Sequence, residues 1–164
     1  MNELVVILEA FPDKTWNWDM VSRNPKITME YVLAHPNLPW NWYYLSGNPN
    51  ITVVDVLSNP EKDWDWDRVS NKNTLIMENV LPDIEKWSWK WVSMNPNITM
   101  EDVLTNPNLP WNWEWISMNP RITMEFILAN PSLPWDWNFV SFNKELTMDV
   151  ILTNPDKHWD WSRI

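Results

Sequence analysis

Apolar residues recur along the chain in two alternating groups, and each group has the spacing of one face of a short helix. In the first group, Met100, Val103 and Leu104 are separated by three residues and then by one. In the second group, Trp113 and Ile116 are three residues apart, and both groups return in the other copies. Such spacing places side chains on one face of an α-helix. The pattern therefore predicts two kinds of short helix that alternate along the chain.

Polar residues mark the beginning and the end of each predicted helix. The first helix follows a Thr such as Thr99 or Thr123, and the second follows a residue such as Asn112, which stands between Trp111 and Trp113. In the seven copies this intervening residue is always Asn, Asp or Ser. These types are preferred N-caps because their side-chain oxygen accepts a hydrogen bond from a backbone N–H at the helix start. Asn-Pro pairs follow the helices and end them, because proline lacks the N–H that a continuing helix needs.

Seven Trp-x-Trp pairs set the period of the sequence. The first members are Trp16, Trp40, Trp64, Trp87, Trp111, Trp135 and Trp159. They are 24 residues apart, except for one step of 23 between Trp64 and Trp87. A period of this length is typical of a solenoid, in which each unit buries its apolar face against its neighbours. We therefore expect an all-α solenoid of about seven 24-residue units, each made of two short helices joined by Asn-Pro turns.

We expect the whole chain, 1–164, to form a single repeat domain. The approximate unit boundaries are 1–23, 24–47, 48–71, 72–94, 95–118, 119–142 and 143–164. The fourth unit is irregular, because Ile76 replaces the capping Thr and Pro82 lies in an altered turn with one residue missing. Helices this short are unstable alone, since helix nucleation is unfavourable. The 16 Trp residues are expected to hold them in place as core residues. Exposed Trp rings for carbohydrate binding are the alternative, and the constancy of the Trp pairs favours packing.

Composition argues against several classes of function. The chain has no Cys, so it has no disulfide, no thiolate nucleophile and no Cys-ligated zinc site. Its formal charge of −10 argues against nucleic acid, because phosphate binding requires clustered Lys and Arg. The apolar segment 1–10 is short and contains Glu3 and Glu9, so we expect neither a signal peptide nor a membrane span. We therefore expect a soluble intracellular protein that is not secreted and has no membrane partner.

No cluster of residues has the pattern of a catalytic or metal site. The carboxylate-rich run 63–67 and the pair Glu101 and Asp102 lie at predicted helix starts, where capping and the helix dipole explain them. They lack the spacing of a calcium-binding EF-hand. The two histidines, His35 and His158, lie near opposite ends of the array without repeated partners. We therefore expect no catalytic residue, no metal site and no cofactor, and we do not expect an enzyme.

One set of positions varies between copies while the surrounding pattern stays constant. It lies two residues after the second Trp of each pair and again three residues later, and it ranges from Arg and Gly to Trp, Met and Phe. A core position would not alternate between Arg and Trp, so these positions predict a variable stripe opposite the face of Trp113 and Ile116. The third residue of the first helix varies in a similar way. The candidate partner-binding residues are Tyr44, Trp91, Met94, Trp115, Met118, Phe126, Phe139 and Phe142.

The recurring words of the sequence carry a resemblance. Asn-Pro-x-Ile-Thr, Asn-Pro-x-Leu-Pro-Trp-[Asn/Asp]-Trp and [Ile/Val]-Ser-x-Asn-Pro resemble the Trp-rich tandem repeats of uncharacterised proteins from mimivirus-like giant DNA viruses. The resemblance spans nearly the whole chain. It implies a location in the cytoplasm of an infected host cell or in a virion, and it implies no activity or ligand.

The pattern as a whole favours a non-enzymatic scaffold. Solenoids commonly bind partners through variable faces on a constant frame. We therefore expect a protein or peptide partner, and the negative charge favours a basic or amphipathic one. Two alternatives remain open: the stripe side chains pack on neighbouring units, or the protein is a self-associating structural component of a virion or filament.

Overall fold

The computed structural model describes residues 3–164, and all regular secondary structure in that range is helical. The α-helices are α1 (Glu3–Ala10), α2 (Trp18–Arg23), α3 (Met29–Ala34), α4 (Trp42–Ser46), α5 (Val53–Leu57), α6 (Trp66–Ser70), α7 (Met77–Val80), α8 (Trp89–Met94), α9 (Met100–Thr105), α10 (Trp113–Ser117), α11 (Met124–Ala129), α12 (Trp137–Val140) and α13 (Met148–Thr153). A 3₁₀ helix, η1 (Leu81–Asp83), lies in the irregular fourth repeat. The predicted all-α solenoid of two-helix repeats is confirmed.

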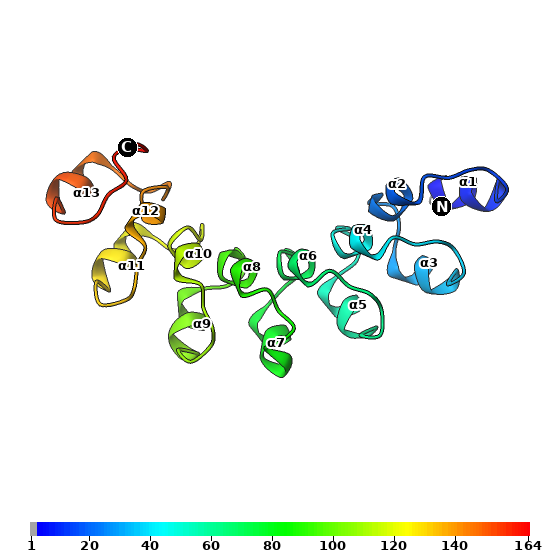
Figure 1. The fold of residues 1–164 in the computed structure, drawn as a ribbon, viewed down its shortest axis with the longest axis horizontal. Helices are drawn as coiled ribbons and strands as arrows, with labels where there is room; N and C mark the ends of the chain where they lie inside the picture. Colours follow the sequence, from blue (N-terminus) through cyan, green and yellow to red (C-terminus); the bar gives the residue numbers. More distant parts are fainter. Residues whose placement is uncertain (1–2) are drawn as a thin grey trace. The chain divides into compact units, whose positions relative to one another are not determined.

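The chain forms two compact units, unit 1 (Met1–Thr74) and unit 2 (Leu75–Ile164). In unit 1 the second helices of successive repeats, α2, α4 and α6, pack side by side. In unit 2 the corresponding helices α8, α10 and α12 do the same. Within each unit the first helices of the repeats form a separate row (Figure 1). The single-domain organisation expected from the sequence stays a prediction.

Most of the capping residues act as their types predict, and Ser88 is an exception because its side chain makes no cap bond to α8. The side chains of Thr28, Thr52, Thr99, Thr123 and Thr147 each accept a hydrogen bond from the backbone N–H of the third residue of the following helix. Asn17, Asn41, Asp65, Asn112 and Asp136 do the same for the second helices. Two of the first helices have a full capping box. In each, the carboxylate of the Asp at the third helix position accepts a 2.8 Å hydrogen bond from the backbone N–H of the capping Thr. These bonds explain why the capped helices, which have only four to six residues, have fixed starting points.

The two tryptophans of each pair have different environments. The first member is buried in six of seven repeats, and in five of these six its indole N–H donates to the carbonyl five residues earlier, as from Trp111 to Asn106 at 2.9 Å. The second member is half-buried and lies edge-on against the first Trp of the next repeat, as Trp113 does on Trp135 with ring centroids 5.4 Å apart. Trp161, the last second member, is 67% exposed. The expectation of core tryptophans therefore holds for six of the first members, since Trp16 is half-buried. It is wrong for the second members, which join repeats at the edge of the core.

Buried polar side chains also connect each repeat to the next. The hydroxyls of Ser22, Ser46, Ser93, Ser117 and Ser141 accept the backbone N–H of the N-cap residue of the following repeat at 2.9–3.0 Å. The buried amide of Asn119 donates to the carbonyls of Ser93 and Asn95, one repeat earlier, at 2.8 and 3.0 Å. Asn48 makes the equivalent bonds in unit 1. Because a buried polar group without a partner is destabilising, these links fix the register of neighbouring repeats.

Candidate functional site

In unit 2 the predicted stripe forms a continuous row of aromatic rings, which we call the aromatic ladder. The ring centroids of Trp91 in α8 and Trp115 in α10 are 5.8 Å apart, and those of Trp115 and Phe139 in α12 are 6.3 Å apart. Phe139 lies a further 6.3 Å from Phe142. The first three rings are half-buried, and Phe142 is 45% exposed. The rings therefore pack on one another between repeats and also present part of their surface to solvent.

The remaining predicted residues are distributed around this ladder. Met94 and Met118 are half-buried and stand three residues after Trp91 and Trp115, which is one turn further along each helix. Phe126 does not join the ladder, because it packs edge-on against Trp135 of its own repeat. In other repeats the position of Phe126 holds the Asp of the capping box, so its variability reflects two ways of stabilising a helix start.

In unit 1 the same stripe contains arginine in place of aromatic rings. Tyr44 of α4 has the guanidinium carbons of Arg23 and Arg68 at 5.7 and 6.0 Å from its ring centroid. Arg68 lies closer still to Tyr43, at 3.7 Å. These side chains line a groove of about 530 Å³ together with Gly47. We call this site the Arg-Tyr groove; its lining is Arg23, Pro25, Tyr43, Tyr44, Gly47, Pro49 and Arg68.

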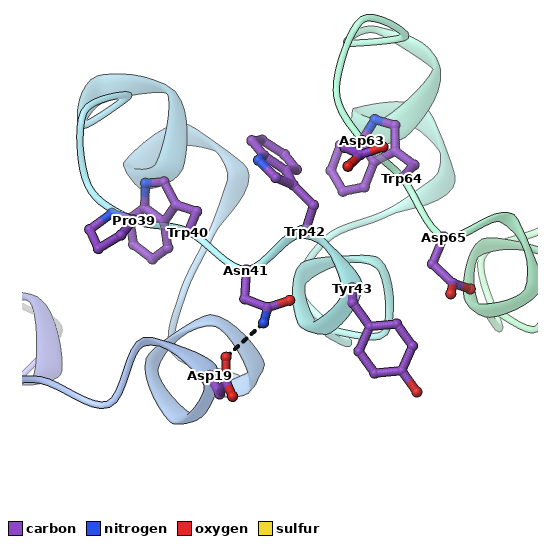
Figure 2. Close-up of a pocket in the computed structure, with 9 residues that line it drawn as sticks. All are labelled: Asp19, Pro39, Trp40, Asn41, Trp42, Tyr43, Asp63, Trp64 and Asp65. Atoms are coloured by element: carbon purple, nitrogen blue, oxygen red, sulfur yellow. Dashed lines mark hydrogen bonds between the residues drawn. The ribbon is translucent and has the colours of Figure 1, made fainter.

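A second concave site in unit 1 is acidic. It has a volume of about 570 Å³ and is lined by Asp19, Pro39, Trp40, Asn41, Trp42, Tyr43, Asp63, Trp64 and Asp65 (Figure 2). Two of its carboxylates have structural partners: Asp65 caps α6, and Asp19 accepts the side-chain N–H of Asn41 at 2.6 Å. Figure 2 shows the Asn41 amide directed at Asp19. The capping role predicted for carboxylates in the run 63–67 is thus confirmed at Asp65.

Other residues singled out by the sequence have local structural roles. Over residues 3–164, no group of three or more His, Asp and Glu side chains is arranged to hold a metal ion. His35 ends α3, where its Nδ1 lies 3.0 Å from the carbonyl of Tyr31 and its ring stacks on the Tyr31 ring. In the same described range, no helix has both the length and the apolar character needed to cross a membrane.

Lys72 is a buried cation that the sequence reasoning missed. It takes the place of the bridging Asn, and its Nζ donates to the carbonyl of Asn48 at 2.8 Å, as Asn119 does to Asn95 in unit 2. The residue is only 7% exposed. Burial lowers the pKa of Lys72 to about 8, against the opposing attraction of Asp55. The signal was available in the sequence, because Lys72 interrupts an otherwise regular Ser-x-Asn pattern.

Comparison of the chain with protein-family models, curated proteins and solved structures finds no match.

Proposed function

We propose that the protein is a non-enzymatic scaffold that binds a protein or peptide partner through the aromatic ladder of unit 2. One observation carries the proposal: three successive repeats present half-buried rings side by side at the positions that vary between copies. Partly exposed aromatic and Met side chains in one row are typical of interaction sites, since they combine large contact area with adaptable packing.

Charge supports a basic or amphipathic partner. The chain carries a formal charge of −10, so a cationic partner is attracted over distances of about a Debye length. The ladder also accepts cations at short range, because the Nζ of Lys90 lies 4.5 Å from the ring centroid of Trp115 and 5.2 Å from that of Trp91. A partner's Lys or Arg side chain can use the same attraction to ring faces.

A selection of displayed peptides against the intact chain, followed by matched variants, tests this proposal. The variant Trp115→Ser with Phe139→Ser removes two central rings, and we expect it to weaken binding of the selected basic peptides by at least about 10-fold. The control Leu104→Ser with Leu152→Ser changes two exposed apolar residues of the same unit outside the ladder. Binding by the native chain should also weaken as salt increases.

Two results would count against the ladder as the binding surface. Equal loss of binding in both double variants would mean that general surface hydrophobicity drives the interaction. Loss of cooperative unfolding in the ladder variant alone would show that the rings act as packing between repeats. Circular dichroism during chemical denaturation separates this outcome from loss of binding by a folded protein.

Self-association as a structural component is the second candidate, and one observation favours it. The last repeat exposes several large apolar side chains: Met148 is 61% exposed and Leu152 is 68% exposed, and Trp161 is similarly open. A second copy could cover this surface. Static light scattering of the pure protein over a range of concentrations should then show a rising mass, and a constant monomer mass would contradict it. With either function, we propose a location in an infected cell or a virion, which is what the resemblance to giant-virus repeats implies.

A further inference from the structure

We infer that the Arg-Tyr groove of unit 1 is a separate binding site for the oxyanion of an acidic peptide, either an Asp or Glu carboxylate or a phosphorylated side chain. This inference goes beyond the aromatic ladder, because all of its residues lie in unit 1. The groove contains two of the four arginines and two of the three tyrosines in the chain. In a protein with 22 acidic residues, this concentration of cations in one groove sets the site apart from its surroundings.

Both guanidinium groups lie against tyrosine rings. Arg68 lies over the Tyr43 ring, and both Arg23 and Arg68 lie near Tyr44. Within residues 3–164, neither guanidinium lies within 4.0 Å of a carboxylate oxygen. A ring contact uses the face of a guanidinium, and the in-plane N–H donors match the two oxygens of a carboxylate or phosphate. The site thus has positioned donors that no ion pair inside the protein engages.

Gly47, the single glycine of the chain, leaves open the space that the Arg68 guanidinium occupies. Its φ of −94° is one that any residue adopts, so backbone conformation does not explain the glycine. A Cβ at this position would lie 2.6 Å from Nη1 of Arg68, which is too close for the guanidinium to keep its place. Other repeats carry Arg, Asn, Met or Phe here. The missing side chain of Gly47 therefore leaves room for the guanidinium of Arg68 in the groove.

The shape and lining of the groove favour a peptide over a small free anion. Its volume of about 530 Å³ falls in the usual range for ligand sites and exceeds what one phosphate or carboxylate would fill. Pro25, Pro49 and the two tyrosine rings line the same groove and add apolar surface to it. Such surface suits the backbone and neighbouring side chains of an extended peptide, while the arginines bind its oxyanion.

Isothermal calorimetry at constant ionic strength tests the inference with four probes. These are an acetylated tetraglutamate peptide, the matching tetraglutamine peptide, a phosphoserine peptide of the same length, and inorganic phosphate. We expect the tetraglutamate and phosphoserine peptides to bind and the tetraglutamine peptide not to bind, and the tighter of the two acidic peptides identifies the oxyanion. Inorganic phosphate should bind at least about 10-fold more weakly than that peptide.

Three variants connect the binding to the groove. Arg68→Ala should weaken binding of the acidic peptides by about 10-fold or more, the usual effect of losing a charged hydrogen-bond donor. Gly47→Ala should weaken it several-fold with the charge unchanged, because the new Cβ displaces the guanidinium. Arg121→Ala, in unit 2, removes the same charge away from the groove and should leave affinity within about 2-fold.

The inference is overturned if the tetraglutamine peptide binds as well as the acidic peptides, if none of the peptides binds, or if phosphate alone binds as tightly. It is also overturned if Arg121→Ala weakens binding as much as Arg68→Ala, since total charge would then explain the effect. Arg68→Lys keeps the charge and the fold but not the planar donor set, so it guards against loss of binding through unfolding. Changes to the aromatic ladder should not affect these affinities, so this site and the ladder can fail independently.

Discussion

The variable stripe is cationic in unit 1 and aromatic in unit 2. Beneath the stripe, both units contain buried Trp, Ser and Asn residues that hold the repeats together, and we call these residues the frame. In unit 1, Tyr44 lies near two arginines. In unit 2 the same repeat position holds Trp91 in one repeat and Trp115 in the next. Buried Ser and Asn residues make the same bonds between repeats in both units, and Lys72 is an exception because it replaces a bridging Asn. Residues that hold the repeats together are thus separate from residues that differ between surfaces. The comparison predicts that frame changes alter stability and that stripe changes mainly alter recognition.

The largest expected effect concerns the frame. Trp40→Ala in unit 1 and Trp111→Ala in unit 2 should each lower the free energy of unfolding by about 3–5 kcal/mol, because each removes a buried ring and an indole hydrogen bond. Trp113→Ala should have a smaller effect, since that ring is half-buried. Denaturant titration followed by circular dichroism measures all three. Losses at Trp40 and Trp111 that differ by more than about 1 kcal/mol would mean that the two units do not share one frame.

The next effect concerns the one bridging position where the frame of unit 1 differs. Lys72 has a pKa of about 8 in the folded protein, below the 10.5 of a free lysine, so the unfolded chain holds more protons between these values. The free energy of unfolding should therefore rise as pH increases from about 8 to 10.5, by roughly 1–3 kcal/mol. Below pH 8 the penalty for burying the charge is fully present.

Lys72→Asn restores the residue found in other repeats and should remove this contribution. We expect the variant to be more stable than the native protein at pH 7, by about 1 kcal/mol, and to lose the rise with pH. Lys144→Asn is the matched control, because Lys144 is exposed and its replacement should change stability by less than about 0.5 kcal/mol. A Lys72→Asn protein that is less stable than the native one would show that the lysine is preferred at this site.

The smallest expected effect concerns the stripe of unit 1. Arg68→Ala should lower the free energy of unfolding by less than about 1 kcal/mol, because cation–π contacts at partly exposed sites contribute about that much. Thermal unfolding followed by circular dichroism measures the change. A loss comparable to that of Trp40→Ala would place Arg68 in the frame and would remove the distinction between frame and stripe.

Much of the fold was predictable because its rules are local. Thr and Asn or Asp caps, Asn-Pro turns and the Trp period each act within one repeat, so reading one copy gives the others. The difference in burial between the two members of each Trp pair was not predictable in this way. Trp111 and Trp113 are equally constant in the sequence, and only the packing of the next repeat shows that one is buried and the other half-buried.

The candidate sites were predictable as positions but not as surfaces. Variation between copies located the stripe, and the structure brings Trp91, Trp115 and Phe139 into one row. Variation alone could not show that Phe126 packs on Trp135, because a capping Asp and a packed Phe vary in the same way. It also could not connect Gly47 with Arg68, which are 21 residues apart and meet only through the stacking of α4 and α6.

The buried serine hydroxyls also bear on how such a chain can evolve. Each hydroxyl reaches a backbone N–H that is 19 residues further along, and this separation is the same at all five sites. A duplicated segment of one full period brings its own serine and its own backbone N–H donor for the preceding serine, so no new interface has to arise by mutation. An insertion that moves a serine out of register with its N–H leaves a buried hydroxyl and a buried N–H without each other. Recombination that copies whole periods is therefore tolerated, and the stripe of each new copy is free to diverge.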